Sequence, residues 1–295
     1  MIARLLEPFT HGFMVEAMLV GSLVGVSCAL LSCYLVLKGW SLMGDAVSHA
    51  VLPGVVIAYM IGWPLSVGAF LAGLFCALAT GWIKAHSRVK EDTVMGIVFT
   101  GLFALGLVLF SRVQTDLHLN HILFGNLLGI ESEDMVEATV CAGVALVVVL
   151  VKRRDLLVYC FDPAHARAVG LRPQALHYLF LCLISAVIVA SLQAVGIILT
   201  VAMLITPGCT ARLLTDRFDR TLLIAALSAV SAAVGGTYIS YFIDGATGAC
   251  IVLVQSFIFS LALVFGPRHG LLAGRRATAT ARNASLAPPA TGAEA

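Results

Sequence analysis

The residues best suited to chemistry in this sequence are Asp45 and His49, which lie four positions apart in an otherwise apolar stretch. On a helix, side chains four apart project from one face, so a carboxylate oxygen and an imidazole nitrogen can share one cation. This ligand pair suits Mn²⁺, Fe²⁺ or Zn²⁺ and suits Cu(I) poorly. Ser48 lies next to that face and is a further candidate for an ion pathway. Because two ligands are too few for tight binding, the pattern predicts an incomplete site that can release its ion.

A structural interpretation of the same pair stays open. Asp45 would then cap the start of a helix near a membrane surface, and His49 would bond to a neighbouring helix. Ionisable residues inside apolar spans are costly and usually mark a pathway, so the sequence favours the metal site.

A second candidate is the segment 162–170, which carries signals for both ends of a short helix. Its aspartate is a good N-cap, its proline suits the first helical position, and its final glycine suits a left-handed stop. Such a helix, rich in small residues, forms a compact knob that fits a groove on a partner protein. The alternative is a loop helix that lies on its own bundle. The candidate docking residues are Asp162, Pro163, Ala166, Arg167 and Gly170.

Thr206 and Pro207 form a third candidate, because they interrupt an apolar run. Proline removes a backbone hydrogen bond, and a bilayer tolerates such a break only where it is buried in protein or lines a wet cavity. The two residues are therefore pathway candidates, although a helix end near the membrane surface explains them equally well. His118 and His121 could capture an incoming cation, but histidines in exposed loops are more often simply solvated.

Composition indicates which elements position these residues. Of 295 residues, 60% are hydrophobic and 12% are charged, which is about half the ~25% charged share of a soluble domain. A membrane-spanning helix needs ~20 apolar residues, and the chain contains a series of apolar runs separated by turn or charge signals. The runs lie at 14–37, 46–61, 64–83, 94–110, 135–151, 176–194, 195–214, 222–243 and 247–265. The sequence therefore predicts an all-α, polytopic membrane bundle of about nine transmembrane helices.

Basic residues predict the orientation of this bundle, because cytoplasmic loops retain Lys and Arg. If the N-terminus lies outside, all of the 18 Lys and Arg residues except Arg4 and Arg112 fall in inside segments. The apolar segment 117–130 is too short for a span and suits a re-entrant or surface-lying position on the outer face. We expect a transmembrane domain over 1–274 and a disordered cytoplasmic tail over 275–295.

Absent motifs exclude several function classes. The chain has no G-x-x-x-x-G-K-[ST] sequence to cradle ATP phosphates, and it lacks H-E-x-x-H and G-x-S-x-G. A net charge of +2 gives no basic face for nucleic acid. The eight cysteines contain no C-x-x-C pair and suit small buried positions. We therefore expect a non-enzymatic protein with no bound cofactor and no nucleic-acid partner.

Four stretches carry a family resemblance: LKGWSLMGDAVSHAVLPG (37–54), RVKEDTVMGIVF (88–99), FDPAHARAVGL (161–171) and VAMLITPGCTARLLTDRFDR (201–220). They resemble the membrane permease subunits of bacterial ABC importers for manganese and chelated iron, which are relatives of the zinc permeases. The resemblance runs from the first span to about Gly274. It implies a type II importer permease in the bacterial inner membrane, paired with a second permease that is identical or paralogous.

The same resemblance implies partners and roles for the candidate residues. A pair of cytoplasmic ATPases would supply ATP hydrolysis, and an extracytoplasmic metal-binding lipoprotein would deliver the ion. Asp45 and His49 match the residues thought to bind metal in the translocation path, and 162–170 matches the helix that couples to the ATPase. The surrounding sequence looks closer to the manganese and iron branch, so the expected cargo is Mn²⁺ or Fe²⁺.

Three alternatives remain open at this point. A zinc permease would share the Asp and His pair. An ion-coupled secondary transporter would need its own carboxylates at mid-membrane, where Asp45 is nearly alone. An intramembrane metalloenzyme would need three protein ligands and a base, which the spans do not supply.

Overall fold

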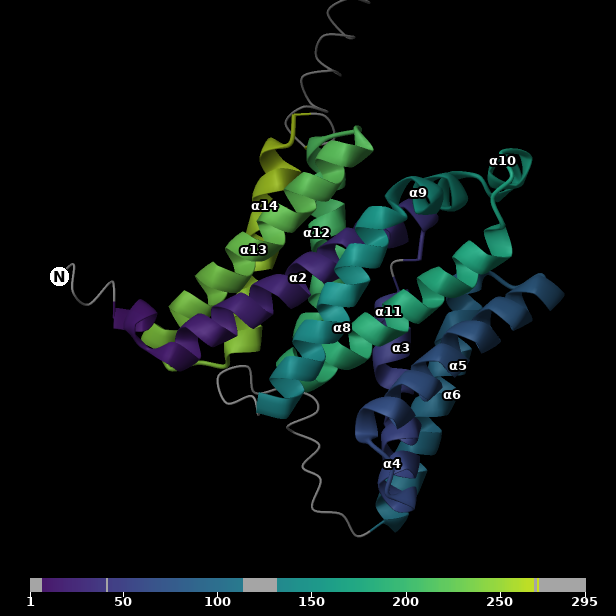
Figure 1. Ribbon diagram of the computed structural model, residues 1–295, viewed down its shortest axis with the longest axis horizontal. Coiled ribbons are helices and arrows are strands. Elements are labelled where there is room, and N and C mark those ends of the chain that lie inside the picture. Colours follow the sequence, from purple (N-terminus) through teal and green to yellow (C-terminus); the bar gives the residue numbers. More distant parts are fainter. Residues whose placement is uncertain (1–6, 41, 114–131, 268–269, 271–295) are drawn as a thin grey trace, which may run out of the picture.

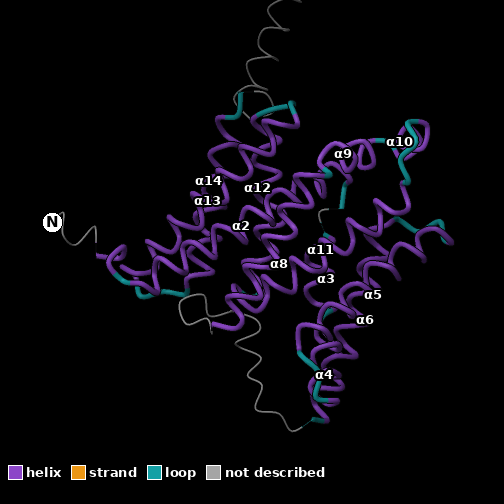
Figure 2. Tube along the Cα trace, viewed as in Figure 1, coloured by secondary structure: helices purple, strands orange, loops and turns teal. Residues whose placement is uncertain are grey.

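A computed structural model describes residues 7–40, 42–113, 132–267 and 270, and Figures 1 and 2 show helices joined by short connections. Within these residues, 9 helical segments are long and apolar enough to cross a membrane, which confirms the predicted bundle. The membrane-spanning helices are α2 (Gly12–Lys38), α3 (Met43–Ala50) with α4 (Leu52–Ile61), α5 (Leu65–His86), α6 (Glu91–Arg112), α8 (Ser132–Val151), α11 (Pro173–Val195), α12 (Ile197–Leu214), α13 (Phe218–Ile243) and α14 (Thr247–Phe265). Two shorter helices, α9 (Arg153–Phe161) and α10 (Pro163–Ala168), join α8 to α11.

Helix α2 forms the centre of the larger part of the bundle. It contacts α8, α12 and α13, and its buried residues continue along most of its length. Helices α3 to α6 pack on one another and reach the rest of the bundle mainly through α11 and α12 (Figure 1). The candidate site on α3 therefore lies where these two groups of helices meet.

The second apolar run forms two helices rather than the single one that the sequence predicts. Helix α3 ends at Ala50, and α4 begins at Leu52 with Pro53 in its first turn. The break follows from Pro53, because its nitrogen has no hydrogen to donate to the preceding turn. Asp45 and His49 consequently lie on a short helix of their own.

Most other helices begin two to four residues before the predicted apolar runs. Helix α6 begins at Glu91 and α13 at Phe218, ahead of runs predicted from 94 and 222. Acidic residues are favourable in the first turn of a helix. Because they lower the hydropathy of that turn, a run of apolar residues begins after the helix does. Helix α9 is not predicted from an apolar run for the same reason, because its first turn is charged. The predicted boundary between the runs 176–194 and 195–214 is confirmed, since α11 ends at Val195 and Gly196 has a φ of 81°.

Small residues bring α4 and α5 into close contact, because glycine lets the two backbones approach. A Cβ atom built on Gly54 would overlap the backbone of Gly68, and one built on Gly68 would overlap the backbone of Gly54. The segment 117–130, its two histidines, and the predicted tail 275–295 with its boundary at 274 lie outside the described residues.

Candidate functional site

Asp45 and His49, hereafter the metal pair, lie on one face of α3 as their spacing predicts. Oδ1 of Asp45 is 3.3 Å from Nε2 of His49, and the two side chains are 37% and 29% exposed respectively. First-row cations bind oxygen and nitrogen ligands at about 2.0–2.2 Å. Both atoms can therefore reach one ion, and the pair stays open on one side.

Two aromatic rings of α6 hold the imidazole of His49 in place. Phe103 meets it edge-on with ring centroids 5.3 Å apart, and Phe99 lies more nearly parallel at 6.1 Å. Nδ1 of His49 is buried and has no hydrogen-bond partner among the described residues, so Nε2 is the nitrogen directed at Asp45. Sequence reasoning missed both phenylalanines, although their four-residue spacing places them on one helix face.

Ser48 faces the protein interior rather than the open side of the metal pair. It is 2% exposed, and its Oγ donates a hydrogen bond to the Gly44 carbonyl at 2.7 Å. Gly44 in turn lies against Leu204 of α12. These contacts fit a helix-packing role, and a place for Ser48 in an ion pathway stays a prediction.

Thr206 and Pro207 lie inside α12 rather than at a helix end. The backbone beside the proline is satisfied by α2, because Ser32 Oγ accepts from Gly208 N at 3.0 Å and donates to the Ile205 carbonyl at 3.1 Å. The break is thus buried in protein, one of the two surroundings expected for it. A pathway role for Thr206 and Pro207 stays a prediction.

Among the residues that the structure describes, the metal pair does not have a full coordination shell. Across the part of the chain that the structure describes, no three His, Cys, Asp or Glu side chains are grouped closely enough to hold a metal ion. The incomplete site that releases its ion stays a prediction. The exposed side of the pair is where further ligands have room.

The segment 162–170, hereafter the docking segment, folds as its residues predict. Oδ1 of Asp162 accepts a hydrogen bond from Ala164 N at 2.8 Å, and Pro163 begins α10. Gly170 has a φ of 84°, which is the left-handed conformation expected at the stop. Both ends of the short helix are therefore fixed by the residues that signalled them.

The exposed surface around α10 is mixed, with an apolar side chain at each end of the helix. Ala166 is fully buried against its own chain, whereas Arg167 is exposed. Phe161 and Val169, on either side of α10, are 79% and 62% exposed. Helix α10 projects from one end of the bundle (Figure 1). A role of this projecting helix as a contact surface for another protein stays a prediction.

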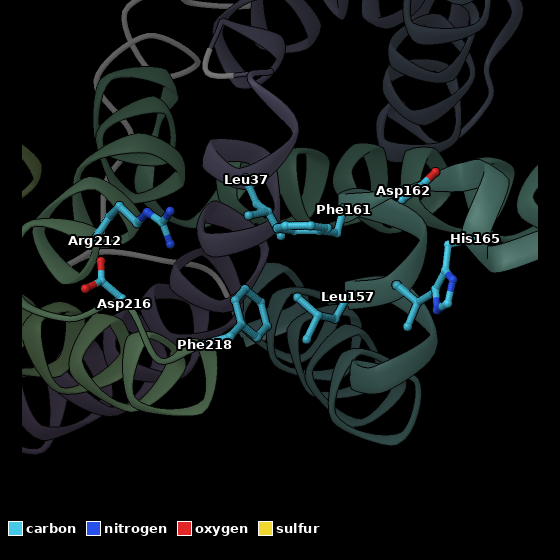
Figure 3. Close-up of a pocket in the computed structure, with 9 residues that line it drawn as sticks. Leu37, Leu157, Phe161, Asp162, His165, Arg212, Asp216 and Phe218 are labelled. Carbon is cyan, nitrogen blue, oxygen red and sulfur yellow. The ribbon is translucent and has the colours of Figure 1, made fainter.

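A groove of about 750 Å³ opens beside the docking segment. Apolar side chains line its centre, including Phe161 and Phe218, and polar side chains stand on both sides of them (Figure 3). The polar residues are Asp162, His165, Arg212 and Asp216. The groove thus extends from α10 to the connection between α12 and α13.

Cys160 lies on α9, directly before the docking segment, and is buried. Burial raises the pKa of its thiol to about 12, although the nearby charge of Lys38 acts in the opposite direction. The thiol therefore stays protonated at neutral pH and is a poor nucleophile.

Comparisons with known proteins identify the family. The ABC 3 transport family matches residues 10–266. The chain is 59% identical to the chelated iron transport system membrane protein YfeD of Yersinia pestis over 259 residues, covering 88% of this chain and 87% of YfeD. It is 49% identical to the manganese transport system membrane protein MntB of Synechocystis over 269 residues, covering 91% and 88% of the two chains.

Solved structures share the fold of this chain. The structure of PsaBC from Streptococcus pneumoniae in complex with Fab matches with a TM-score of 0.83 and 34% identity, covering 93% of this chain and 100% of that one. An inward-facing structure described as a metal-chelate type ABC transporter shares the fold, with a TM-score of 0.66, 16% identity, and coverage of 84% and 85%. This chain belongs to the ABC 3 transport family.

Proposed function

We propose that this chain is the membrane-spanning permease subunit of an ATP-driven importer that carries Mn²⁺ or Fe²⁺ into a bacterial cytoplasm. The family and the manganese and chelated-iron relatives support this class of cargo. The observation that carries the proposal is the metal pair, whose ligand atoms lie 3.3 Å apart on the open face of α3.

The chemistry of the metal pair suits a transported ion better than a resident one. The Asp45 carboxylate offsets part of the positive charge in a low-dielectric path, and the His49 nitrogen adds a ligand suited to first-row metals. Water, or the same pair on a second permease, completes the shell on the exposed side. A shell with so few ligands from one chain lets the ion leave.

Other subunits supply the energy and deliver the ion. The chain has no ATP phosphate-binding loop, so a pair of cytoplasmic ATPases docks at the docking segment and the exposed Phe161 ring beside it. An extracytoplasmic metal-binding lipoprotein presents the ion at the opposite face. In this arrangement the chain lies in the bacterial inner membrane, with its N-terminus outside and α10 in the cytoplasm. The distribution of Lys and Arg supports this orientation.

Metal uptake by a strain that lacks every other importer tests the proposed cargo. We expect the chain and its partner subunits to restore uptake of Mn²⁺ and Fe²⁺, and an ATPase unable to hydrolyse ATP to abolish it. Preferential uptake of Zn²⁺ would identify a zinc permease instead. Uptake that continues without ATP hydrolysis would identify a secondary transporter.

Variants of the metal pair test the site itself. Asp45→Asn keeps the side-chain shape and removes the charge, and His49→Ala removes the nitrogen ligand. Each should lower uptake by roughly 100-fold while the complex still assembles. Asp244→Asn, an exposed carboxylate after α13, is the matched control and should have no effect.

Two outcomes would contradict the assignment of the metal pair. Loss of assembly together with loss of uptake would favour a structural role for Asp45 and His49. Wild-type uptake by either variant would move the search for the path elsewhere, first to Thr206 and Pro207.

A further inference from the structure

Trp40 fixes both ends of the connection between α2 and α3. Helix α2 stops at Gly39, whose φ is 76°, and Trp40 N donates a hydrogen bond back to the Leu35 carbonyl at 2.9 Å. The Trp40 carbonyl accepts a hydrogen bond at 3.1 Å from Met43 N, in the first turn of α3. Because Asp45 is only two residues further along, a displacement of Trp40 moves the start of the helix that carries the metal pair.

The Trp40 side chain holds this connection against α11. Trp40 is 8% exposed. The His177 ring meets the indole edge-on, with centroids 5.8 Å apart, and the Phe180 ring lies more nearly parallel at 6.2 Å. Two aromatic contacts from one helix leave the indole little freedom to move independently of its surroundings.

Tyr159 links this aromatic group to the helix that carries the docking segment. The Tyr159 hydroxyl and Nδ1 of His177 form a hydrogen bond of 2.8 Å. Nζ of Lys38 lies 4.2 Å from the centroid of the Tyr159 ring and 5.6 Å from that of Trp40. Tyr159 is on α9, three residues before Asp162, the N-cap of α10. Direct contacts therefore run from the docking segment to the first turn of α3.

We propose that Trp40, held by His177 and Tyr159, is a positioning residue that transmits displacement of the docking segment to the metal pair. This inference rests on the proposed function, because it takes ATPase docking at α10 and metal binding on α3 as its two ends. Close-packed rings and hydrogen bonds transmit displacement because they cannot absorb it by collapsing into empty space. Trp40 touches neither the ion nor the ATPase, so its effect is on coupling between the two.

The test measures ATP hydrolysis and Mn²⁺ uptake together, with the assembled transporter in vesicles. Trp40→Leu removes the indole and keeps an apolar residue, so the complex should hydrolyse ATP at close to the wild-type rate while transporting much less Mn²⁺. We expect the number of ATP molecules hydrolysed per ion to rise by about 5- to 150-fold. This is the range of factors to which the usual coupling free energies between two sites correspond. Trp40→Phe retains a ring and should restore most of the coupling.

Helix α11 also packs on α3, so the control must separate Trp40 from α11 as a whole. Ile188→Ala removes a fully buried side chain from α11. It leaves in place His177 and Phe180, whose rings contact Trp40. It should lower thermal stability and leave the ratio of ATP to Mn²⁺ unchanged. Tyr159→Phe removes only the hydroxyl that bonds to His177, and it should raise the ratio by a smaller factor than Trp40→Leu.

The outcomes distinguish this inference from the proposed function. A ratio that is unchanged in both Trp40→Leu and Tyr159→Phe would overturn the inference while Mn²⁺ transport by the wild type stands. If Trp40→Leu does not assemble, Tyr159→Phe alone decides, because it preserves the ring and the packing. A wild-type complex that transports no Mn²⁺ or Fe²⁺ would instead overturn the proposed function.

Discussion

Replacing Phe161 with alanine should weaken ATPase docking without unfolding the permease. Phe161 is 79% exposed at the end of α9, so its ring contributes little to the bundle itself. Full burial of a phenylalanine side chain contributes about 1.5–3 kcal/mol, so covering the exposed share of this one contributes about 1.2–2.4 kcal/mol. At about 1.4 kcal/mol per factor of ten, the loss corresponds to roughly 7- to 50-fold weaker docking per permease.

Titration of the purified permease in nanodiscs with its ATPase measures this change directly. The matched control is Phe257→Ala, which removes a ring that is 64% exposed on the membrane-spanning helix α14. Because this ring lies within a membrane-spanning helix and outside the docking segment, ATPase affinity should not change. Wild-type affinity in Phe161→Ala would refute the reasoning that assigns this apolar surface to the ATPase. A large fall in thermal stability would show that the ring supports the bundle instead.

Three further predictions test the fold and the surroundings of the site. Gly208→Ala should lower stability by about 1–3 kcal/mol, because a Cβ there would lie 2.5–2.8 Å from side-chain and backbone atoms of α2. Gly143→Ala should leave stability unchanged, because a Cβ there would have nothing within 4 Å. Thermal unfolding in detergent compares the two variants. In a background without native cysteines, an impermeant maleimide should label Asp244→Cys from outside intact cells and leave His86→Cys unlabelled, and the reverse pattern would invert the topology. Phe103→Leu should lower apparent Mn²⁺ affinity in uptake assays by roughly 10-fold, because it loosens the imidazole of His49, and an unchanged affinity would contradict the contact's role.

Hydropathy predicted the number and approximate position of the spans because each long apolar run has only one stable solution in lipid, a helix. It could not predict the break at Val51, because hydropathy does not register the backbone hydrogen bond that Pro53 removes. It also placed helix starts late, because the polar first turn of α6 at Glu91 is helical without being hydrophobic.

Some features of the candidate site follow from local sequence, and others depend on how the helices pack. The spacing of Asp45 and His49 and the cap of Asp162 are local properties, and the structure has both as predicted. The phenylalanines of α6 and the inward orientation of Ser48 depend on which helix lies beside α3, and no local pattern contains that. The close contact of the Ser32 side chain with the backbone beside Pro207 likewise joins residues far apart in sequence.

Exchange of one ligand type for another tests the metal pair most directly. His49→Cys replaces an imidazole nitrogen with a thiolate, which prefers Zn²⁺ over Mn²⁺. If His49 binds the ion, Mn²⁺ uptake by this variant should fall by roughly 10-fold or more, while Zn²⁺ should become a stronger competitor for the uptake that remains. Unchanged Mn²⁺ uptake with unchanged Zn²⁺ competition would contradict the account, because an ion that passes Asp45 and His49 must respond to the chemistry of its ligand.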